Sequence, residues 1–170
     1  PATTMDWVAM EDIEFDGGLP YGGHATQGNT GIDLTNKGFR IQDSTVKFIH
    51  LRHVTMRNFG GELYYNGALP GSHDLIEHCL FDGSPQSAFN PTSAGTGTYI
   101  EVQAGNAYAP VELVGGTGKT LIGGRFYDGY VCGLLGGSAG DGIFHSSYGY
   151  EYPWRSATEP ATRSTSPTSA

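Results

Sequence analysis

The densest group of ionisable side chains lies in the segment His73-Asp74-Leu75-Ile76-Glu77-His78. Hydrolysis of a glycosidic bond requires two carboxylates, which Asp74 and Glu77 offer. A lyase instead needs a base that removes a proton next to a sugar carboxylate, and a cation that stabilises the resulting anion. Three residues along a strand put Asp74 and Glu77 on opposite faces. A solvated polar face is therefore the simpler explanation of the segment, and a reactive site is the alternative.

Two histidines, His53 and His78, occupy the same position in two similar segments 25 residues apart. In stacked coils they would lie about 5 Å apart, one strand spacing, as a proton-transfer pair or a metal pair. A ladder of stacked polar side chains at a bend explains them without chemistry. If the group is catalytic, we expect His53, His78 and Glu77 to act on the substrate. Arg52, one coil from Glu77, would then hold the acid group of a uronate.

Ten tyrosines are many for a weakly charged chain of 170 residues. Aromatic faces combined with polar side chains suit sugar rings by stacking and hydrogen bonding, although core packing explains an aromatic equally well. His24 lies in a glycine-rich segment between two repeats, and loops on a rigid scaffold often carry function. The substrate-binding residues that we expect are Tyr64, Tyr65, His73, Asp74 and His24.

Asp16, Asp82 and Asp128 form a series that suggests Ca²⁺, which prefers carboxylate oxygens. Each of the three precedes a glycine, so Asp-Gly turns explain the series without a metal. We therefore predict no cofactor and keep Ca²⁺ as the alternative. Cys79 and Cys132 can form one disulfide or remain two buried free thiols.

The segments that carry these residues repeat a common pattern. It consists of an apolar residue, two mostly polar residues, a second apolar residue, a variable residue and then Phe, Met or Tyr, usually closed by Asp-Gly. Because side chains alternate across a strand, the pattern predicts two short strands separated by a two-residue bend. Asp-Gly then supplies the next turn. The copies are residues 9–17, 50–58, 75–83 and 121–129.

The spacing of the copies favours a solenoid. They begin 41, 25 and 46 residues apart, and the 25-residue step suits one coil. The longer steps suit a coil with a long loop, or two tight coils. Further strand candidates lie at 31–34, 62–65, 98–102 and 130–132. Strands at this spacing also fit a β-sandwich, but the repeated pattern favours the solenoid.

The segment Leu75-Ile76-Glu77-His78-Cys79-Leu80-Phe81-Asp82-Gly83 resembles a coil of the right-handed parallel β-helix proteins. This superfamily includes pectate-lyase-like enzymes, polygalacturonases, alginate and chondroitin lyases, and phage tailspikes. The resemblance covers residues 7–135 and implies an all-β fold, a right-handed single-stranded parallel β-helix. It concerns packing and not chemistry, because the polygalacturonase motifs and the calcium-binding Asp cluster of pectate lyases are missing.

In such a coil, the apolar residues of the pattern point inward and stack on their counterparts in the neighbouring coils. Arg125 departs from this pattern, since it places a charge where the other copies have Ile, Val or Cys. We therefore expect either a cap or a slip of register in the last copy. The expected inward residues are Met10, Ile13, Phe15, Leu51, Val54, Met56, Ile76, Cys79, Phe81, Ile122 and Tyr127.

The composition sets limits on domains and partners. Residues 155–170 contain ten Ser, Thr or Pro and no large apolar side chain, so we predict a β-helix module at 1–154 and a linker or tail at 155–170. The net charge of −8, from 17 acids and 9 bases, argues against nucleic acid as a partner. No run approaches the roughly 18 apolar residues of a membrane-spanning helix, so we expect no membrane insertion. The chain begins at Pro1, and we expect a processed product or an excised piece.

These observations lead to a function only by class. We expect an extracellular or virion-associated module that binds, and in one interpretation also cleaves, a polysaccharide. If it is an enzyme, it is a polysaccharide lyase or a glycoside hydrolase. The alternative is a non-catalytic structural solenoid, such as an adhesin shaft, a tailspike part or a filament subunit that assembles into a homo-oligomer.

Overall fold

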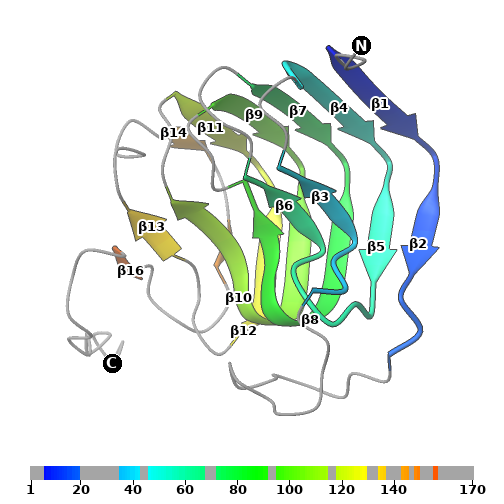
Figure 1. Ribbon diagram of the computed structural model, residues 1–170. Coiled ribbons are helices and arrows are strands. Elements are labelled where there is room, and N and C mark those ends of the chain that lie inside the picture. Colours follow the sequence, from blue (N-terminus) through cyan, green and yellow to red (C-terminus); the bar gives the residue numbers. More distant parts are fainter. Residues whose placement is uncertain are drawn as a thin grey trace, which may run out of the picture.

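The computed structural model describes residues 6–19, 35–42, 46–67, 72–91, 95–114 and 118–129, together with the backbone of short strands at 134–136, 143–145, 148–149 and 155–156. The regular elements in this part of the chain are all strands, and they pair in parallel throughout (Figure 1). The search of the same residues for a helix that could span a membrane found none.

The first sheet contains one strand from each successive coil. Its order is β1 (Trp7–Glu11), β4 (Phe48–Arg52), β7 (His73–Glu77), β9 (Thr96–Ile100), β11 (Lys119–Ile122) and β14 (Ile143–His145). Each coil then turns into a second sheet, with the order β2 (Glu14–Asp16), β5 (Thr55–Arg57), β8 (Leu80–Asn90), β10 (Gln103–Val114), β12 (Arg125–Gly129) and β15 (Tyr148–Gly149).

A third row of strands closes the coils. β3 (Phe39–Ile41) pairs with β6 (Tyr64–Asn66), and β6 pairs with the end of the long strand β8. The end of β10 continues the row to β13 (Leu134–Gly136) and β16 (Arg155–Ser156). The prediction of an all-β parallel solenoid is therefore confirmed, while its right-handedness stays a prediction. Residues 155 and 156, the first two of the expected tail, form β16, and the rest of the tail lies outside the described residues.

Two bends shape each coil, and both use the left-handed backbone conformation. At the first bend Asp12, His53, His78 and Glu101 have φ between 51° and 53°. Asp and His enter this region more readily than most residues with a Cβ. The amide of each donates to a carbonyl of the next coil, for example His53 N to Glu77 O at 3.0 Å. The first bend therefore stacks one polar side chain from each of these four coils at a corner of the solenoid.

The second bend shows the expected turn chemistry. Gly83 there has φ of 89°, as the Asp-Gly turn predicts. The Asn58 side chain donates to Asp16 Oδ1 at 3.2 Å, and Asn106 donates to Asp82 Oδ1 at 2.7 Å. Asn and Asp thus form a hydrogen-bonded ladder from coil to coil.

Most of the interior is apolar, and six of the expected inward residues are fully buried there. They are Leu51, Val54, Met56, Ile76, Cys79 and Phe81. Each contributes roughly 1.5–3 kcal/mol of hydrophobic stabilisation. Cys79 is a free thiol, and Cys132 lies outside the described residues.

The first coil departs from the expectation. Met10 and Phe15 are only partly buried, and Ile13 is 41% exposed. The reason is their place at the end of the stack. In the described part of the chain, β1 pairs only with β4 and β2 only with β5, so these side chains are covered from one side.

The last copy also departs, because its register slips by one residue. Leu121 pairs with Tyr99, which pairs with Ile76, so Leu121 points inward and Ile122 is 40% exposed. In the same way Phe126 is buried, while Tyr127 is only partly buried. Arg125 therefore points outward, with its guanidinium 5.0 Å from the centre of the Tyr127 ring. Of the two alternatives, cap or slip, the structure shows the slip.

The long steps between copies have different origins. β9 and β10 form a complete coil between the third and fourth copies, so the 46-residue step is two coils. β1 pairs directly with β4, so the 41-residue step is one coil with a long connection.

Candidate functional site

The outward surface of β1, β4 and β7, which we call the outer face, gathers the most exposed aromatic and ionisable side chains of the first sheet. Strand alternation and the parallel register arrange them in three rows across the coils. The aromatic row is Trp7, Phe48 and His73; the middle row is Ala9, His50 and Leu75; the charged row is Glu11, Arg52 and Glu77.

The aromatic row is open to solvent. Trp7 is 58% and Phe48 45% exposed, although both are large apolar residues. Their ring centroids are 5.5 Å apart, and Phe48 lies 6.5 Å from His73. His73 Nδ1 is 2.6 Å from the Thr96 hydroxyl oxygen of β9. A row of apolar rings that the fold leaves uncovered marks a surface for an apolar face of a ligand.

The charged row is paired within itself and with the middle row. Arg52 forms an ion pair with Glu11 of the preceding coil. His50 Nε2 donates to Glu77 Oε2 at 2.8 Å. The guanidinium expected to hold the acid group of a substrate thus already has a carboxylate partner, and Glu77 is tied to a histidine.

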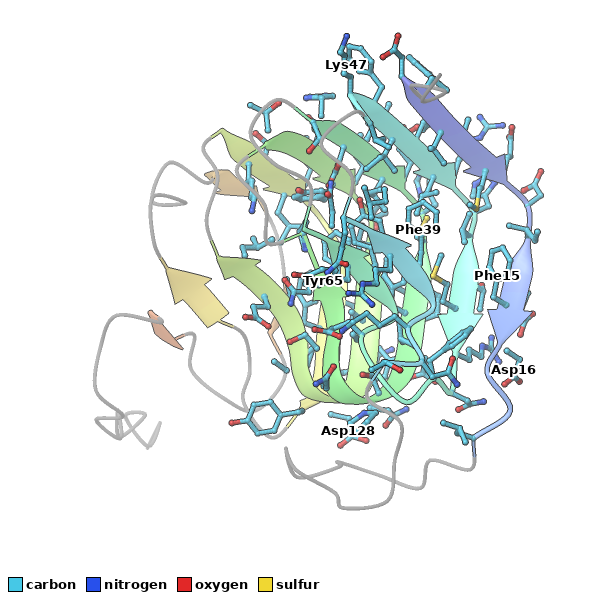
Figure 2. All side chains as sticks on the ribbon, viewed as in Figure 1. Phe15, Asp16, Phe39, Lys47, Tyr65 and Asp128 are labelled. Atoms are coloured by element: carbon cyan, nitrogen blue, oxygen red, sulfur yellow. The ribbon has the colours of Figure 1, made fainter. Side chains whose placement is uncertain are left out.

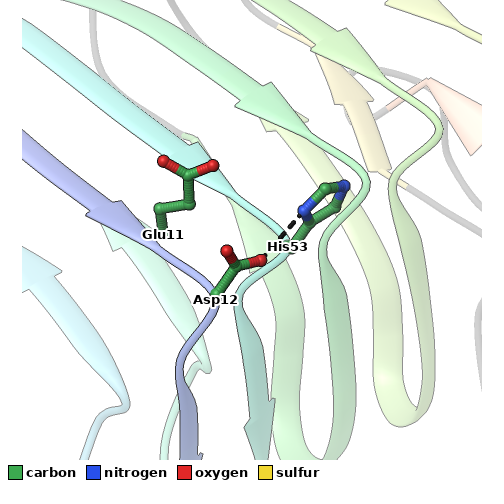
Figure 3. Close-up of side chains that lie close together, drawn as sticks. All are labelled: Glu11, Asp12 and His53. Atoms are coloured by element: carbon green, nitrogen blue, oxygen red, sulfur yellow. Dashed lines mark hydrogen bonds and ion pairs between the residues drawn. The ribbon is translucent and has the colours of Figure 1, made fainter.

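The first bend borders the outer face and brings three ligand-type side chains together (Figure 3). His53 Nδ1 donates to Asp12 Oδ1 at 3.0 Å, and the ligand atoms of Glu11, Asp12 and His53 lie within 4.8 Å of one another. One imidazole and two carboxylates are a donor set that Zn²⁺ or Mn²⁺ accepts. All three residues are exposed, and Arg52 competes for Glu11. The group can therefore hold a metal only weakly.

The two histidines of the proton-transfer hypothesis lie side by side. The His53 and His78 ring centroids are 5.5 Å apart, on neighbouring coils of the first bend. When His53 Nδ1–H donates to Asp12, Nε2 is the ring nitrogen that would act as the base. His53 and Asp12 together have the geometry of a general base with an orienting carboxylate. The other two expected catalytic residues, Glu77 and Arg52, are paired with His50 and Glu11.

Two of the expected substrate-binding residues are inside the solenoid. Tyr64 is fully buried and Asp74 is 2% exposed, so neither can contact a polysaccharide on the surface, and their assignment is wrong. The Tyr64 hydroxyl donates to Asp74 Oδ2 at 2.9 Å, and Asn66 donates to Asp74 Oδ1 at 2.7 Å. Burial raises the pKa of Asp74 to about 6, although these hydrogen bonds and the charge of Lys119 act in the opposite direction.

The other expected residues are spread over the molecule. His73 belongs to the outer face, whereas Tyr65 lies on β6, in the third row of strands (Figure 2). There the Lys37 ammonium lies 4.9 Å from the centre of the Tyr65 ring. His24 lies outside the described residues.

Protein groups donate hydrogen bonds to Asp16 and Asp82 of the aspartate series. Asp16 accepts from the Gly18 amide at 2.8 Å, which lowers its pKa, and also from Asn58. Asp82 accepts from Asn106 and from the Tyr127 hydroxyl. Asp128 sits at the second bend, with φ of 51°. Hydrogen-bond donors of the protein thus contact Oδ1 of both Asp16 and Asp82. Ca²⁺ binding by this series stays a prediction.

Sequence reasoning missed Trp7, Phe48 and His50. The signal for the two aromatic residues lies two positions before the start of each copy of the repeated pattern, and His50 is the first residue of its copy. Extending the second and third copies backward puts Phe48 and His73 in one column, and the same step in the first copy reaches Trp7. The alternation of these residues with buried Ile49 and Leu51 indicates an outward position.

Comparisons of the chain with protein-family models, with curated proteins and with solved structures found no match. The fold defines the protein as a parallel β-solenoid. The resemblance of one coil to the right-handed parallel β-helix proteins is supported only by the parallel β-solenoid fold.

Proposed function

We propose that this β-solenoid binds a polysaccharide on its outer face. The observation that carries the proposal is the exposed aromatic row, Trp7 and Phe48 with His73, one ring per coil. Aromatic rings bind the apolar faces of sugars, and polar side chains beside them accept and donate hydrogen bonds to hydroxyl groups. An extracellular or virion-associated location, where such polymers are met, belongs to the same proposal.

The geometry suits a linear polymer that runs along the solenoid axis. The rings repeat at 5.5 and 6.5 Å, close to the strand spacing, so successive coils present successive stacking surfaces. The middle row lies two residues further along each strand, about 7 Å away, and the charged row four residues further, about 13 Å away. A sugar stacked on Phe48 would therefore direct its substituents toward His50 of the middle row.

Cleavage is a separate question within this proposal. The His53–Asp12 pair could act as a general base at the border of the outer face, with His78 beside it. A lyase would release unsaturated products that absorb in the ultraviolet. Incubation with alginate, pectin, chondroitin and bacterial capsules, followed by analysis of released fragments, tests this. If the protein binds without releasing fragments, it is a binding module.

Binding is tested with two matched aromatic truncations. Phe48→Ala removes a ring from the outer face, and Tyr65→Ala removes a ring from the third row of strands. We expect retention on a bound polysaccharide to fall at least about tenfold in Phe48→Ala, as for the loss of about 1.4 kcal/mol of ring contact, and to persist in Tyr65→Ala. The reverse result would move the site to the other face. Retention of neither the wild type nor any variant on a broad panel would end the proposal.

The structural solenoid is the second candidate, and the open end of the stack favours it. In the described part of the chain, β1, β2 and β3 each pair on one side only. Unpaired strand edges are templates for another chain. Sedimentation velocity over a range of concentrations would reveal end-to-end assembly, and a monomer at all concentrations would count against it.

A further inference from the structure

The middle row of the outer face indicates which sugar substituent fits beside the aromatic row. Ala9 is exposed, and His50 and Leu75 are partly buried. The methyl group of Ala9 and the isobutyl group of Leu75 therefore flank one imidazole, each about one strand spacing of 5 Å away. Because the row lies about 7 Å along the strands from the rings, a substituent of a sugar stacked on Phe48 would meet this largely apolar strip.

The polar atom that the middle row offers to a ligand is Nδ1 of His50. Nε2 donates to Glu77 Oε2 at 2.8 Å, so in the neutral ring Nδ1 carries the lone pair and accepts hydrogen bonds. Within the described part of the chain Nδ1 has no hydrogen-bond partner, and the side chain is 33% exposed. The middle row thus presents one open acceptor between two apolar side chains.

Neither of the two rows that a stacked sugar would touch offers it a charged partner. On β9 the aromatic row continues to Thr96 and the middle row to Thr98, so in the described strands neither row contains a carboxylate, a lysine or an arginine. Lys47, next to the aromatic row, lies 3.5 Å from Asp6. The charged row is about 13 Å from the rings, beyond the Debye length of roughly 8 Å at physiological salt. A charged sugar would therefore lose hydration here without gaining an unpaired partner.

Resting on the proposed function, we infer that the outer face takes an uncharged polysaccharide of N-acetylated amino sugars. Its ring faces stack on Trp7 and Phe48, and its acetamido groups lie over the middle row. There the amide N–H donates to His50 Nδ1, and the methyl group packs against Ala9 or Leu75. An acetamido group joins one donor to one apolar end, whereas a hydroxyl group leaves the apolar side chains uncovered and a carboxylate has no donor for Nδ1.

The test compares three tetrasaccharides by calorimetry: one of N-acetylglucosamine, one of glucose with the same linkage and one of galacturonate. The first two differ in one substituent of each sugar, an acetamido group in place of a hydroxyl group. We expect the N-acetylglucosamine oligomer to bind tightest, at least about fivefold over glucose, as for one net hydrogen bond. Added salt should leave this ratio unchanged, because both oligomers are uncharged. The galacturonate oligomer should bind weakest.

Three variants locate the effect. His50→Leu removes the ring nitrogens and keeps a side chain of similar bulk, so the ratio of N-acetylglucosamine to glucose affinity should fall by about fivefold. His50→Asn supplies an amide oxygen as acceptor and should keep a higher ratio than His50→Leu. Gln103→Leu is the matched control, because it makes the same change from a polar side chain to leucine at an exposed position of β10, in the second sheet. It should leave the ratio unchanged.

The outcomes separate the inference from the proposed function. Equal affinity for the N-acetylglucosamine and glucose oligomers, or tighter binding of galacturonate, overturns the inference while polysaccharide binding stands. The same holds if none of the three oligomers binds but another polysaccharide retains the protein. An unchanged ratio in a natively folded His50→Leu or His50→Asn, judged by circular dichroism, overturns the contact with Nδ1 when both variants agree. If Phe48→Ala binds the oligomers as well as the wild type does, the proposed function itself fails.

Discussion

Asp74 should make the stability of the solenoid depend on pH. Its carboxyl group is buried and accepts hydrogen bonds from the Tyr64 hydroxyl and the Asn66 amide. Burial raises its pKa from 3.8 to about 6. Hydrogen bonds from Tyr64 and Asn66 and the charge of Lys119 lower this pKa but do not offset the effect of burial. An unfolded chain would leave this carboxyl near its ordinary value.

The sign follows from where the proton binds more tightly. Because the folded state has the higher pKa, its stability is greatest below about pH 3.8, as far as this group is concerned, and is lost as the pH rises through about 6. The shift of about two pKa units corresponds to roughly 3 kcal/mol of unfolding free energy at neutral pH.

Asp74→Asn replaces the carboxyl group by an uncharged one of the same shape. The amide has one acceptor oxygen where the carboxylate has two, so about 1 kcal/mol of the gain should be lost again. We expect the variant to be more stable than the wild type by about 2 kcal/mol at pH 7.5, with the difference gone or reversed near pH 4.5. Urea unfolding at these two pH values, followed by circular dichroism, measures this. Burial lowers the pKa of Lys119 to about 8, so most of this group still carries its charge at pH 7.5, and a higher pH should be avoided.

Glu14→Gln is the control, since it removes an exposed carboxylate. Its difference from the wild type should be small at both pH values. The reasoning is refuted if Asp74→Asn is less stable than the wild type at pH 7.5, or if both proteins respond to pH alike.

Three further outcomes follow from buried side chains. The Tyr99 hydroxyl is buried without a hydrogen-bond partner in the described part of the chain, so Tyr99→Phe should raise the unfolding free energy by about 1 kcal/mol in urea; a loss of stability would show an unrecognised partner. Burial raises the pKa of the Cys79 thiol to about 11, so iodoacetamide at pH 8 should label this residue, identified by peptide mass spectrometry, far more slowly in the native than in the unfolded protein. Phe81→Asp places an unpaired charge in the interior stack and should abolish the β-sheet circular dichroism signal at neutral pH; a native spectrum would contradict the inward position of Phe81.

The fold was predictable because three copies keep the same pattern. Leu51 and Ile76 occupy one column, as do Met56 and Phe81, and buried columns of this kind leave little choice of register. The fourth copy was placed one residue off because Leu121 and Ile122 are both apolar, so either fits the inward position. The β9–β10 coil escaped detection as a copy because Ala104 stands where the other coils have a large side chain.

The site was predictable only in part. The pairing of His53 with His78 follows from their equal places in two copies, and the structure confirms it. Asp74 was assigned to the surface although it lies two residues from Ile76 and so shares its inward face. The ion pair of Arg52 with Glu11 could not be chosen from sequence, because Glu11 and Glu77 flank Arg52 equally in the register.

The outer-face claim can be tested most directly through Trp7. The chain has two tryptophans, Trp7 and Trp154, so Trp154→Phe leaves Trp7 as the single indole reporter. Titration of this variant with an oligomer of the polysaccharide that retains the wild type should change the Trp7 emission in a saturable way, with the dissociation constant that calorimetry measures. Addition of Phe48→Ala should weaken that constant at least about tenfold. Calorimetric binding with no change in Trp7 emission would show that the polysaccharide lies elsewhere and would contradict the account.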